Sequence, residues 1–299
     1  MCLLPFPPPA SAQGRPRLDA ARLEDKVQKI IGASGAERVA VAFQDLETGE
    51  EVLVNAGESF HAASMMKVPV MMEVYRQAAA GELPLGGRLP VRNDFESIAD
   101  GSRFSVAAED DSERTLYERV GGTETVRELV RLMITESSNL ATNIVIARVT
   151  PERVMALMRE LGARDIRVLR GVEDGKAYER GLNNTTTARD LLIVLRAIAE
   201  GRVVSGEASE EMVKILLGQK FNEGIPAGVP QGVRVAHKTG SITKVNHDAG
   251  IVYVPGRKPY VLAVLTRGIE DERRAHRLIA DISRAVYESV VEGQNPRER

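Results

Sequence analysis

Strand patterns occur at both ends of this chain, and helical patterns fill most of the sequence between them. Near the beginning, Val39–Phe43 and Glu51–Val54 lie on either side of Glu47-Thr48-Gly49, which is typical of a β-hairpin. Towards the end, strand patterns recur at Val233–His237, Ala249–Val254 and Tyr260–Arg267. This order predicts an α+β fold of the α/β sandwich type. We expect an antiparallel sheet built from both chain ends and flanked by helices, with an all-helical lobe inserted between them.

Apolar residues three and four positions apart predict the helices. They occur at Leu18–Ile31, Thr125–Ile134, Asn139–Arg148, Pro151–Leu161, Thr187–Ala199, Glu207–Leu217 and Glu270–Val291. We expect residues 18–292 to form a single domain, with residues 18–80 and 225–292 in an α/β lobe and residues 81–224 in the helical lobe. A site for a small molecule is then expected in the cleft between the lobes.

Composition excludes several classes of protein. The 299 residues carry a net charge of -2, so there is no electrostatic case for a nucleic acid or an anionic membrane as partner. No apolar run approaches the ~20 residues that a membrane span needs. The four histidines have no metal-ligand spacing, and Cys2 is the only cysteine, so no internal disulfide can form. We expect a monomer without metal or cofactor and without stable membrane insertion.

The segment Met1–Gln13 is apolar and ends in small residues before a polar stretch rich in arginine. This is typical of the second half of a secretory signal peptide, and it predicts cleavage near Ala12 that would remove residues 1–12. The charged start of such a signal is missing, which indicates a start codon further upstream. A disordered proline-rich tail is the alternative interpretation of the same residues.

Ser64 and Lys67 form the pattern S-x-x-K at the start of a predicted helix, which continues through apolar residues to Gly81. Residues three apart share a helix face, so the Lys67 amine lies one turn from the Ser64 hydroxyl. A lysine that has lost its charge can take the proton of a serine and make it a nucleophile. The pattern alone is weak, because Ser241 and Lys244 have the same spacing and no apolar helix follows them.

Two further motifs follow in order. Ser137-Ser138-Asn139 stands between two predicted helices, and Lys238-Thr239-Gly240 closes the strand that begins at Val233. With S-x-x-K, they complete the motif set of class A β-lactamases and penicillin-binding proteins. The chain resembles the class A β-lactamase-like serine hydrolases over nearly its whole length, including Met133-Ile134-Thr135 and Asn184–Thr187 beside the motifs.

The resemblance implies an acyl transfer to Ser64, the only proposed nucleophile. Ser64 would attack the carbonyl carbon of a β-lactam, and Lys67 would manage its proton. Ser137 would pass a proton to the leaving ring nitrogen. Each residue also has an ordinary interpretation, such as a helix cap for Ser137, but the ordered set favours the functional one.

The same resemblance implies how the substrate is held. Asn139 would donate a hydrogen bond to the substrate amide, and Lys238, helped by Thr239, would attract the substrate carboxylate. Gly240 would let the backbone approach the substrate closely. The backbone N–H groups of Ser64 and Ser241 would form the oxyanion hole.

In the class A β-lactamases that the chain resembles, release of the acyl group requires a loop glutamate that activates water. Glu173 lies at nearly the matching place, in a loop about two residues shorter than is usual in the family, and Glu179 is the second candidate. A solvated loop carboxylate is the ordinary interpretation of either. Ser138 stands where the family usually carries aspartate, a residue that braces the site without taking part in the chemistry.

These observations predict a serine β-lactamase, an antibiotic-resistance hydrolase that acts on small-molecule β-lactams and is periplasmic or secreted in a bacterium. One alternative is a D-Ala-D-Ala peptidase or esterase of the same fold that deacylates poorly. Another is a non-catalytic module that binds the cell wall or a partner. The complete set of Ser64, Lys67, Ser137, Asn139 and Lys238 argues against this last alternative, because a binding module needs no nucleophile.

Overall fold

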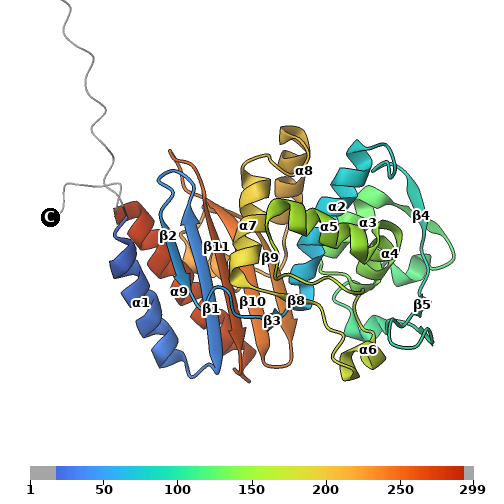
Figure 1. The fold of residues 1–299 in the computed structure, drawn as a ribbon, viewed down its shortest axis with the longest axis horizontal. Coiled ribbons are helices and arrows are strands. Elements are labelled where there is room, and N and C mark those ends of the chain that lie inside the picture. The colour runs from blue at the N-terminus through green and yellow to red at the C-terminus, as the bar shows by residue number, and fades with distance from the viewer. Residues whose placement is uncertain (1–17, 293–299) are drawn as a thin grey trace, which may run out of the picture.

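The computed structural model describes residues 18–292, and its centre is one five-stranded antiparallel sheet (Figure 1). The strand order is β2-β1-β11-β10-β9. These strands are β1 (Arg38–Asp45), β2 (Glu51–Val54), β9 (Arg234–Ile242), β10 (Val245–Tyr253) and β11 (Tyr260–Arg267). Strand β1 from the beginning of the chain pairs along its whole length with β11 from the end, which confirms a sheet built from both chain ends. The predicted signal segment, residues 1–12, lies outside the described residues.

Helices cover both faces of this sheet. Helices α1 (Ala20–Ser34) and α9 (Glu272–Glu292) lie on one face, and α7 (Ala188–Ala199) lies on the other (Figure 1). Alternate residues of each strand point to opposite faces. Thus Val41 packs under α1 and α9, while its neighbour Ala42 belongs to the larger core shared with the helical lobe.

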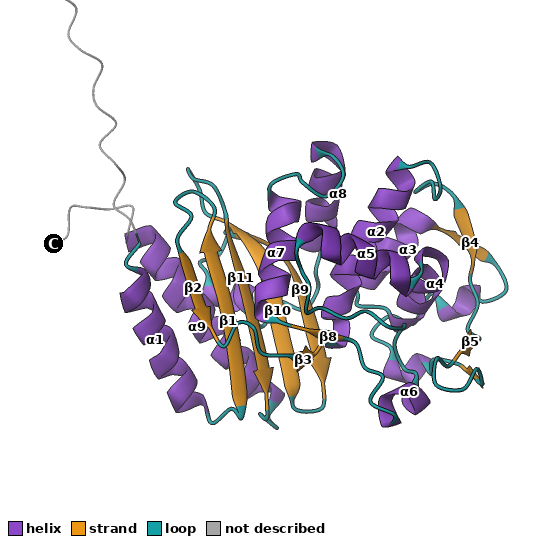
Figure 2. Cartoon of the chain, in the orientation of Figure 1, coloured by secondary structure: helices purple, strands orange, loops and turns teal. Residues whose placement is uncertain are grey.

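The helical lobe packs beside the sheet, and α2, which the sequence-based division assigned to the α/β lobe, runs through its middle (Figure 2). Its remaining α-helices are α3 (Val126–Thr135), α4 (Asn139–Val149), α5 (Pro151–Leu161), α6 (Gly175–Glu179) and α8 (Gly206–Leu217), and α2 spans Lys67–Ala79. Short strand pairs join the loops: β3 (Phe60–His61) with β8 (Thr185–Thr186), β4 (Arg88–Pro90) with β7 (Thr123–Thr125), and β5 (Phe95–Glu96) with β6 (Arg103–Phe104). Between residues 18 and 292 the short 3₁₀ helices are η1 (Ala63–Met66), η2 (Ala108–Asp110), η3 (Tyr117–Arg119) and η4 (Ile225–Gly228).

The structure differs from the sequence-based prediction in two segments near the cleft. Lys238-Thr239-Gly240 does not close its strand but lies inside β9, because backbone pairing with β10 continues to Ile242. The polar loop between α5 and α7 contains the short helix α6, whose first turn is capped by the carboxylate of Asp174. Both features depend on polar backbone contacts, which an apolar pattern does not reveal. None of the helices between residues 18 and 292 is long and apolar enough to cross a membrane.

Candidate active site

Ser64 sits in the 3₁₀ turn η1, which leads directly into α2. The two methionines after it are fully buried, so the turn is anchored in the core while Ser64 stays half-buried. The preceding residue, Ala63, has a φ of 46°, a left-handed conformation that costs about 1 kcal/mol or more in a residue with a side chain. The chain therefore stores local strain at the residue before the predicted nucleophile.

The hydroxyl of Ser137 connects the three motifs. It donates a hydrogen bond to Ser64 Oγ over 3.0 Å. It accepts one from Lys67 Nζ over 3.2 Å and one from Lys238 Nζ over 3.0 Å. A proton can thus move between Ser64 and either lysine through one intervening hydroxyl. Because residue 137 has a φ of 57°, the backbone there is also held in an unusual conformation.

Both lysines at this hydroxyl are fully buried, and burial disfavours their charged forms. Burial lowers the pKa of Lys67 to about 7, although the charges of Asp111 and Glu173 oppose the shift. Burial, followed by the nearby charge of Lys67, also lowers the pKa of Lys238 well below its usual value. Two ammonium groups on one oxygen repel each other, so one of these amines is readily neutral near pH 7. A neutral amine is the form that a general base requires.

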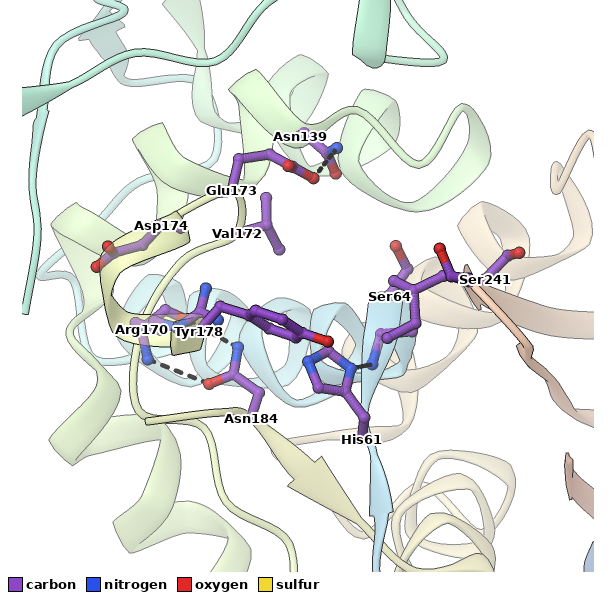
Figure 3. Close-up of a pocket in the computed structure, with 14 residues that line it drawn as sticks. His61, Ser64, Asn139, Arg170, Val172, Glu173, Asp174, Tyr178, Asn184 and Ser241 are labelled. Atoms are coloured by element: carbon purple, nitrogen blue, oxygen red, sulfur yellow. Dashed lines mark hydrogen bonds between the residues drawn. The ribbon is translucent and has the colours of Figure 1, made fainter. Parts of the chain in front are cut away.

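Asn139, the first residue of α4, stands between Lys67 and the loop glutamate. Its Oδ1 accepts a hydrogen bond from Lys67 Nζ over 2.9 Å, and its Nδ2 donates one to Glu173 Oε1 over 3.1 Å. Figure 3 shows Glu173 and Ser64 on different sides of the same cavity. Partial burial raises the pKa of the Glu173 carboxyl, and the charge of Lys67 opposes this. The cavity thus separates Glu173 from Ser64.

The side chain of Asn143 in α4 forms two hydrogen bonds with the backbone just before Glu173. The Asn143 side chain accepts from Val172 N over 2.7 Å and donates to Val172 O over 3.0 Å. A Cβ on Gly171 would lie 2.1 Å from Asn143 Oδ1, so only glycine fits there. Glu173 itself has a φ of 61°. The loop is thus held in a conformation that directs this carboxylate into the cavity.

Strand β9 forms the opposite wall. A Cβ on Gly240 would come within 3.2 Å of Ser64 N, which shows how closely this strand approaches the η1 turn. Ser241 follows, and its hydroxyl donates to Asn246 Oδ1 over 2.9 Å. Thr239 also faces the cleft beside Gly240. Ser64 and Ser241 therefore line the same cavities, which is the arrangement expected if their backbone N–H groups form an oxyanion hole.

Two cavities meet at Ser64, one of about 430 Å³ towards Glu173 and one of about 250 Å³ towards Thr239. Asn139 and Ser241 line both cavities together with Ser64. Glu179 is exposed on α6 and lines neither of them. Among residues 18–292, no group of three His, Cys, Asp or Glu side chains is placed to hold a metal ion.

Sequence reasoning missed two buried polar residues that support the site. Asn143 holds the loop before Glu173, and Asp111 reaches α4 from the irregular segment that precedes α3. Asn143 lies one helical turn after Asn139, a spacing that could have suggested a shared role. Asp111 belongs to the acidic run Glu109-Asp110-Asp111, which reads as a solvated loop. Nothing in the sequence pattern separates Asp111 from its neighbours.

Comparison with known proteins places this geometry in a family. The family model described as "Beta-lactamase enzyme family" matches residues 22–290. A beta-lactamase of Streptomyces albus G is 30% identical over 306 aligned positions, covering 96% of this chain and 91% of that protein. Among solved structures, an ancestral class A beta-lactamase has a TM-score of 0.78 at 25% identity, covering 89% of this chain and 99% of that one.

A mutant of PBP-A, solved as an acyl-enzyme complex with penicillin G, also has a TM-score of 0.78 at 25% identity, and covers 91% of this chain and 97% of that chain. All these likenesses extend over the sheet and the helical lobe together. The chain belongs to the beta-lactamase enzyme family, as a serine hydrolase of the class A type.

Proposed function

We propose that this protein is a serine β-lactamase that opens the β-lactam amide through an acyl-enzyme on Ser64. The observation that carries this proposal is the Ser137 hydroxyl, which donates to Ser64 Oγ and accepts from two buried lysines. Burial lowers the pKa of Lys67 to about 7, which suits proton transfer near neutral pH. The cavity of about 430 Å³ is of the size that small-molecule sites have.

In the acylation step, Ser64 Oγ attacks the lactam carbonyl carbon and its proton passes, through the Ser137 hydroxyl, to the neutral amine of Lys67. The carbonyl oxygen becomes an oxyanion that accepts hydrogen bonds from the backbone N–H groups of Ser64 and Ser241. As the carbonyl re-forms, the C–N bond breaks and the ring nitrogen takes the Ser137 proton. Lys67 then returns its proton to Ser137, which leaves Ser64 esterified and the charges balanced.

In the deacylation step, Glu173 takes a proton from water as the water oxygen attacks the ester carbonyl carbon. The ester C–O bond breaks, and Ser64 Oγ regains a proton that Glu173 gives up. The product is the ring-opened acid. The hydrogen bond from Asn139 to Glu173 supports this role, because it keeps the carboxylate at the cavity. The hydrogen bond from Asn143 to the loop backbone has the same effect. Glu179 lines neither of the two cavities at Ser64, and this argues against it as the base.

The likeness to PBP-A supports a second candidate, a penicillin-binding protein that acylates and releases slowly. Incubation with a chromogenic cephalosporin followed by intact-mass measurement separates the two. Many turnovers per molecule support the β-lactamase. A persistent adduct without turnover supports the penicillin-binding type. If the experiment shows no turnover and no adduct, acyl transfer to Ser64 is refuted altogether.

The pH dependence of acylation tests the role of Lys67. Because burial brings the pKa of Lys67 to about 7, the fraction of neutral amine rises as the pH rises through that value. We expect the acylation rate to rise with pH and to be half-maximal near pH 7. We call this rise of the acylation rate with pH the acid limb. Lys67→Ala should lower the rate about 10²–10⁴-fold and remove the acid limb. A stopped-flow series of single-turnover acylation between pH 5 and 9 measures both, and an unchanged limb in Lys67→Ala would assign it to another group.

Lys238 is expected to act on the substrate carboxylate. Lys238→Ala should slow reaction with penicillins about 10- to 100-fold more than reaction with an uncharged ester, because only the penicillin loses a charged hydrogen bond. Lys244→Ala is the matched control, since that lysine is exposed and pairs with Glu270 over 2.6 Å. Rate constants for both substrates measure the ratio. Equal losses on both would indicate that Lys238 supports only the structure.

We also propose that residues 18–292 act as one domain with the site between its lobes, that the protein works as a monomer, and that it is exported. Related β-lactamases from bacteria and the apolar Met1–Gln13 segment support export. Expression in a bacterium with separation of periplasm and cytoplasm tests the location. Size-exclusion chromatography tests the monomer.

A further inference from the structure

The first turn of α4 carries Asn139 and follows directly on Ser137, so whatever holds this turn also holds the site. A helix start leaves backbone N–H groups without partners inside the helix. Ser138 satisfies one of them, since its hydroxyl accepts from Ala141 N over 3.2 Å. The N–H groups of Asn139 and Leu140 need an acceptor from elsewhere in the chain.

That acceptor is Asp111, which comes from the irregular segment between β6 and α3. Its carboxylate accepts from Asn139 N at 3.0 and 2.9 Å and from Leu140 N over 2.9 Å. Tyr117 Oη donates to it over 2.8 Å, and the Ser138 hydroxyl lies 3.4 Å away. Only 4% of Asp111 is exposed, although it is an aspartate in a surface loop. Such a buried carboxylate persists only where donors surround it.

The contacts of Asp111 extend its influence to the reacting groups. Asn139, whose backbone Asp111 holds, accepts from Lys67 Nζ through its side chain and donates to Glu173. Burial and the hydrogen bond to Asp111 raise the pKa of Tyr117, so this hydroxyl stays a donor. Anions near a helix N-terminus are also favoured by the helix dipole. One carboxylate thus braces the turn that joins the base of acylation to the loop glutamate.

We propose that Asp111 is a positioning residue for acylation: its buried carboxylate fixes the first turn of α4 and supplies the negative charge there that residue 138, a serine in this chain, does not. The proposal rests on the proposed acyl transfer to Ser64. It assigns no contact with substrate to Asp111. Its effect reaches the chemistry through Asn139 and through the electric field at Lys67.

The electric field of Asp111 acts on the pKa of Lys67 and therefore on the pH dependence of acylation. A purely structural role of Asp111 would not change this pH dependence. The charged groups facing Lys67 are Asp111, Glu173 from the loop before α6, and Lys238 from β9. Asp111 raises the pKa of Lys67, against the effect of burial. Without this charge the pKa of Lys67 falls further, and the neutral amine persists to lower pH. The acid limb of the acylation rate should then move to lower pH.

The experiment compares single-turnover acylation by a penicillin in wild type, Asp111→Ala and Asp111→Asn across the pH range. Asp111→Ala should acylate on the order of 10²-fold more slowly, because the catalytic groups lose their fixed geometry. Asp111→Asn keeps the size and one acceptor oxygen, so it should lose less rate and show the acid limb at lower pH. Glu113→Gln is the matched control: this buried carboxylate in the same loop accepts from Thr115 N and Leu116 N, and should change neither rate nor limb.

A carboxylate exchange tests the same assignment independently. The Ser138 hydroxyl lies 3.4 Å from the Asp111 carboxylate. Ser138→Asp alone therefore places a second carboxylate close to that of Asp111, and the repulsion between the two charges should slow acylation. In Asp111→Ala/Ser138→Asp the new carboxylate caps the same turn, and the double variant should be faster than either single variant. If it is the slowest of the three, the two positions act independently and the proposal fails.

Failure of this proposal differs from failure of the proposed function. If wild type forms no adduct at Ser64, acyl transfer is refuted and Asp111 has no acylation to position. If wild type acylates and Asp111→Ala matches its rate, only the positioning role is overturned. Should Asp111→Ala not fold, Asp111→Asn decides: a wild-type rate with an unmoved acid limb overturns the proposal.

Discussion

Ser64→Ala is expected to abolish the acyl-enzyme adduct and to leave the fold intact. Ser64 Oγ accepts a hydrogen bond from Ser137 and lies where the two cavities meet, so it is the hydroxyl that we expect to form the ester. The loss of turnover should be on the order of 10⁶-fold, as is found when a catalytic serine is removed. Intact mass after incubation with a penicillin gives the adduct, and thermal unfolding gives the stability.

Ser241→Ala is the matched control, because Ser241 lines the same cavities and its proposed contribution is its backbone N–H. That variant should still form the adduct. In the wild type, the Ser241 hydroxyl contacts Asn246 and Glu272, away from the proton path. An adduct that survives Ser64→Ala, or that peptide mapping places on Ser241, would contradict the proposed nucleophile.

Glu173→Gln is expected to acylate normally and then to stall. Glutamine cannot take a proton from water, so deacylation should slow about 10²–10⁴-fold. Acylation should persist because Lys67 loses a charge that raises its pKa, and the neutral amine becomes more abundant at pH 7. Mass spectrometry should show a stoichiometric, persistent adduct, and a chromogenic substrate should give one burst followed by little turnover.

Glu179→Gln provides the comparison, since Glu179 is exposed on α6 a few residues further along the same loop. It should turn over nearly as wild type does. A stall in Glu179→Gln with turnover in Glu173→Gln would transfer the role of base to Glu179. If neither variant stalls, the base lies outside this loop, and the hydrogen bond between Asn139 and Glu173 serves only to hold the loop.

The main elements could be predicted from local patterns. The β1–β2 hairpin and the helices α4 and α5 lie within a residue or two of their predicted bounds, because alternation and three- and four-residue spacing record which side of an element is buried. The prediction failed where backbone polar contacts decide. Strand β9 runs through Lys238-Thr239-Gly240 because β10 pairs with it, and α6 forms because Asp174 caps it.

Local sequence also determined the candidates for chemistry, since S-x-x-K, S-x-N and K-T-G name Ser64, Lys67, Ser137 and Lys238 as residue types with suitable reactivity. Only the tertiary structure decided how they are connected. It joins both lysines to Ser64 through the Ser137 hydroxyl, across separations of 70 or more residues, and it buries them so that their pKa values fall. It also selects Asp111 from an acidic run to brace α4. Burial and long-range hydrogen bonding depend on the assembled core, and no stretch of sequence alone encodes them.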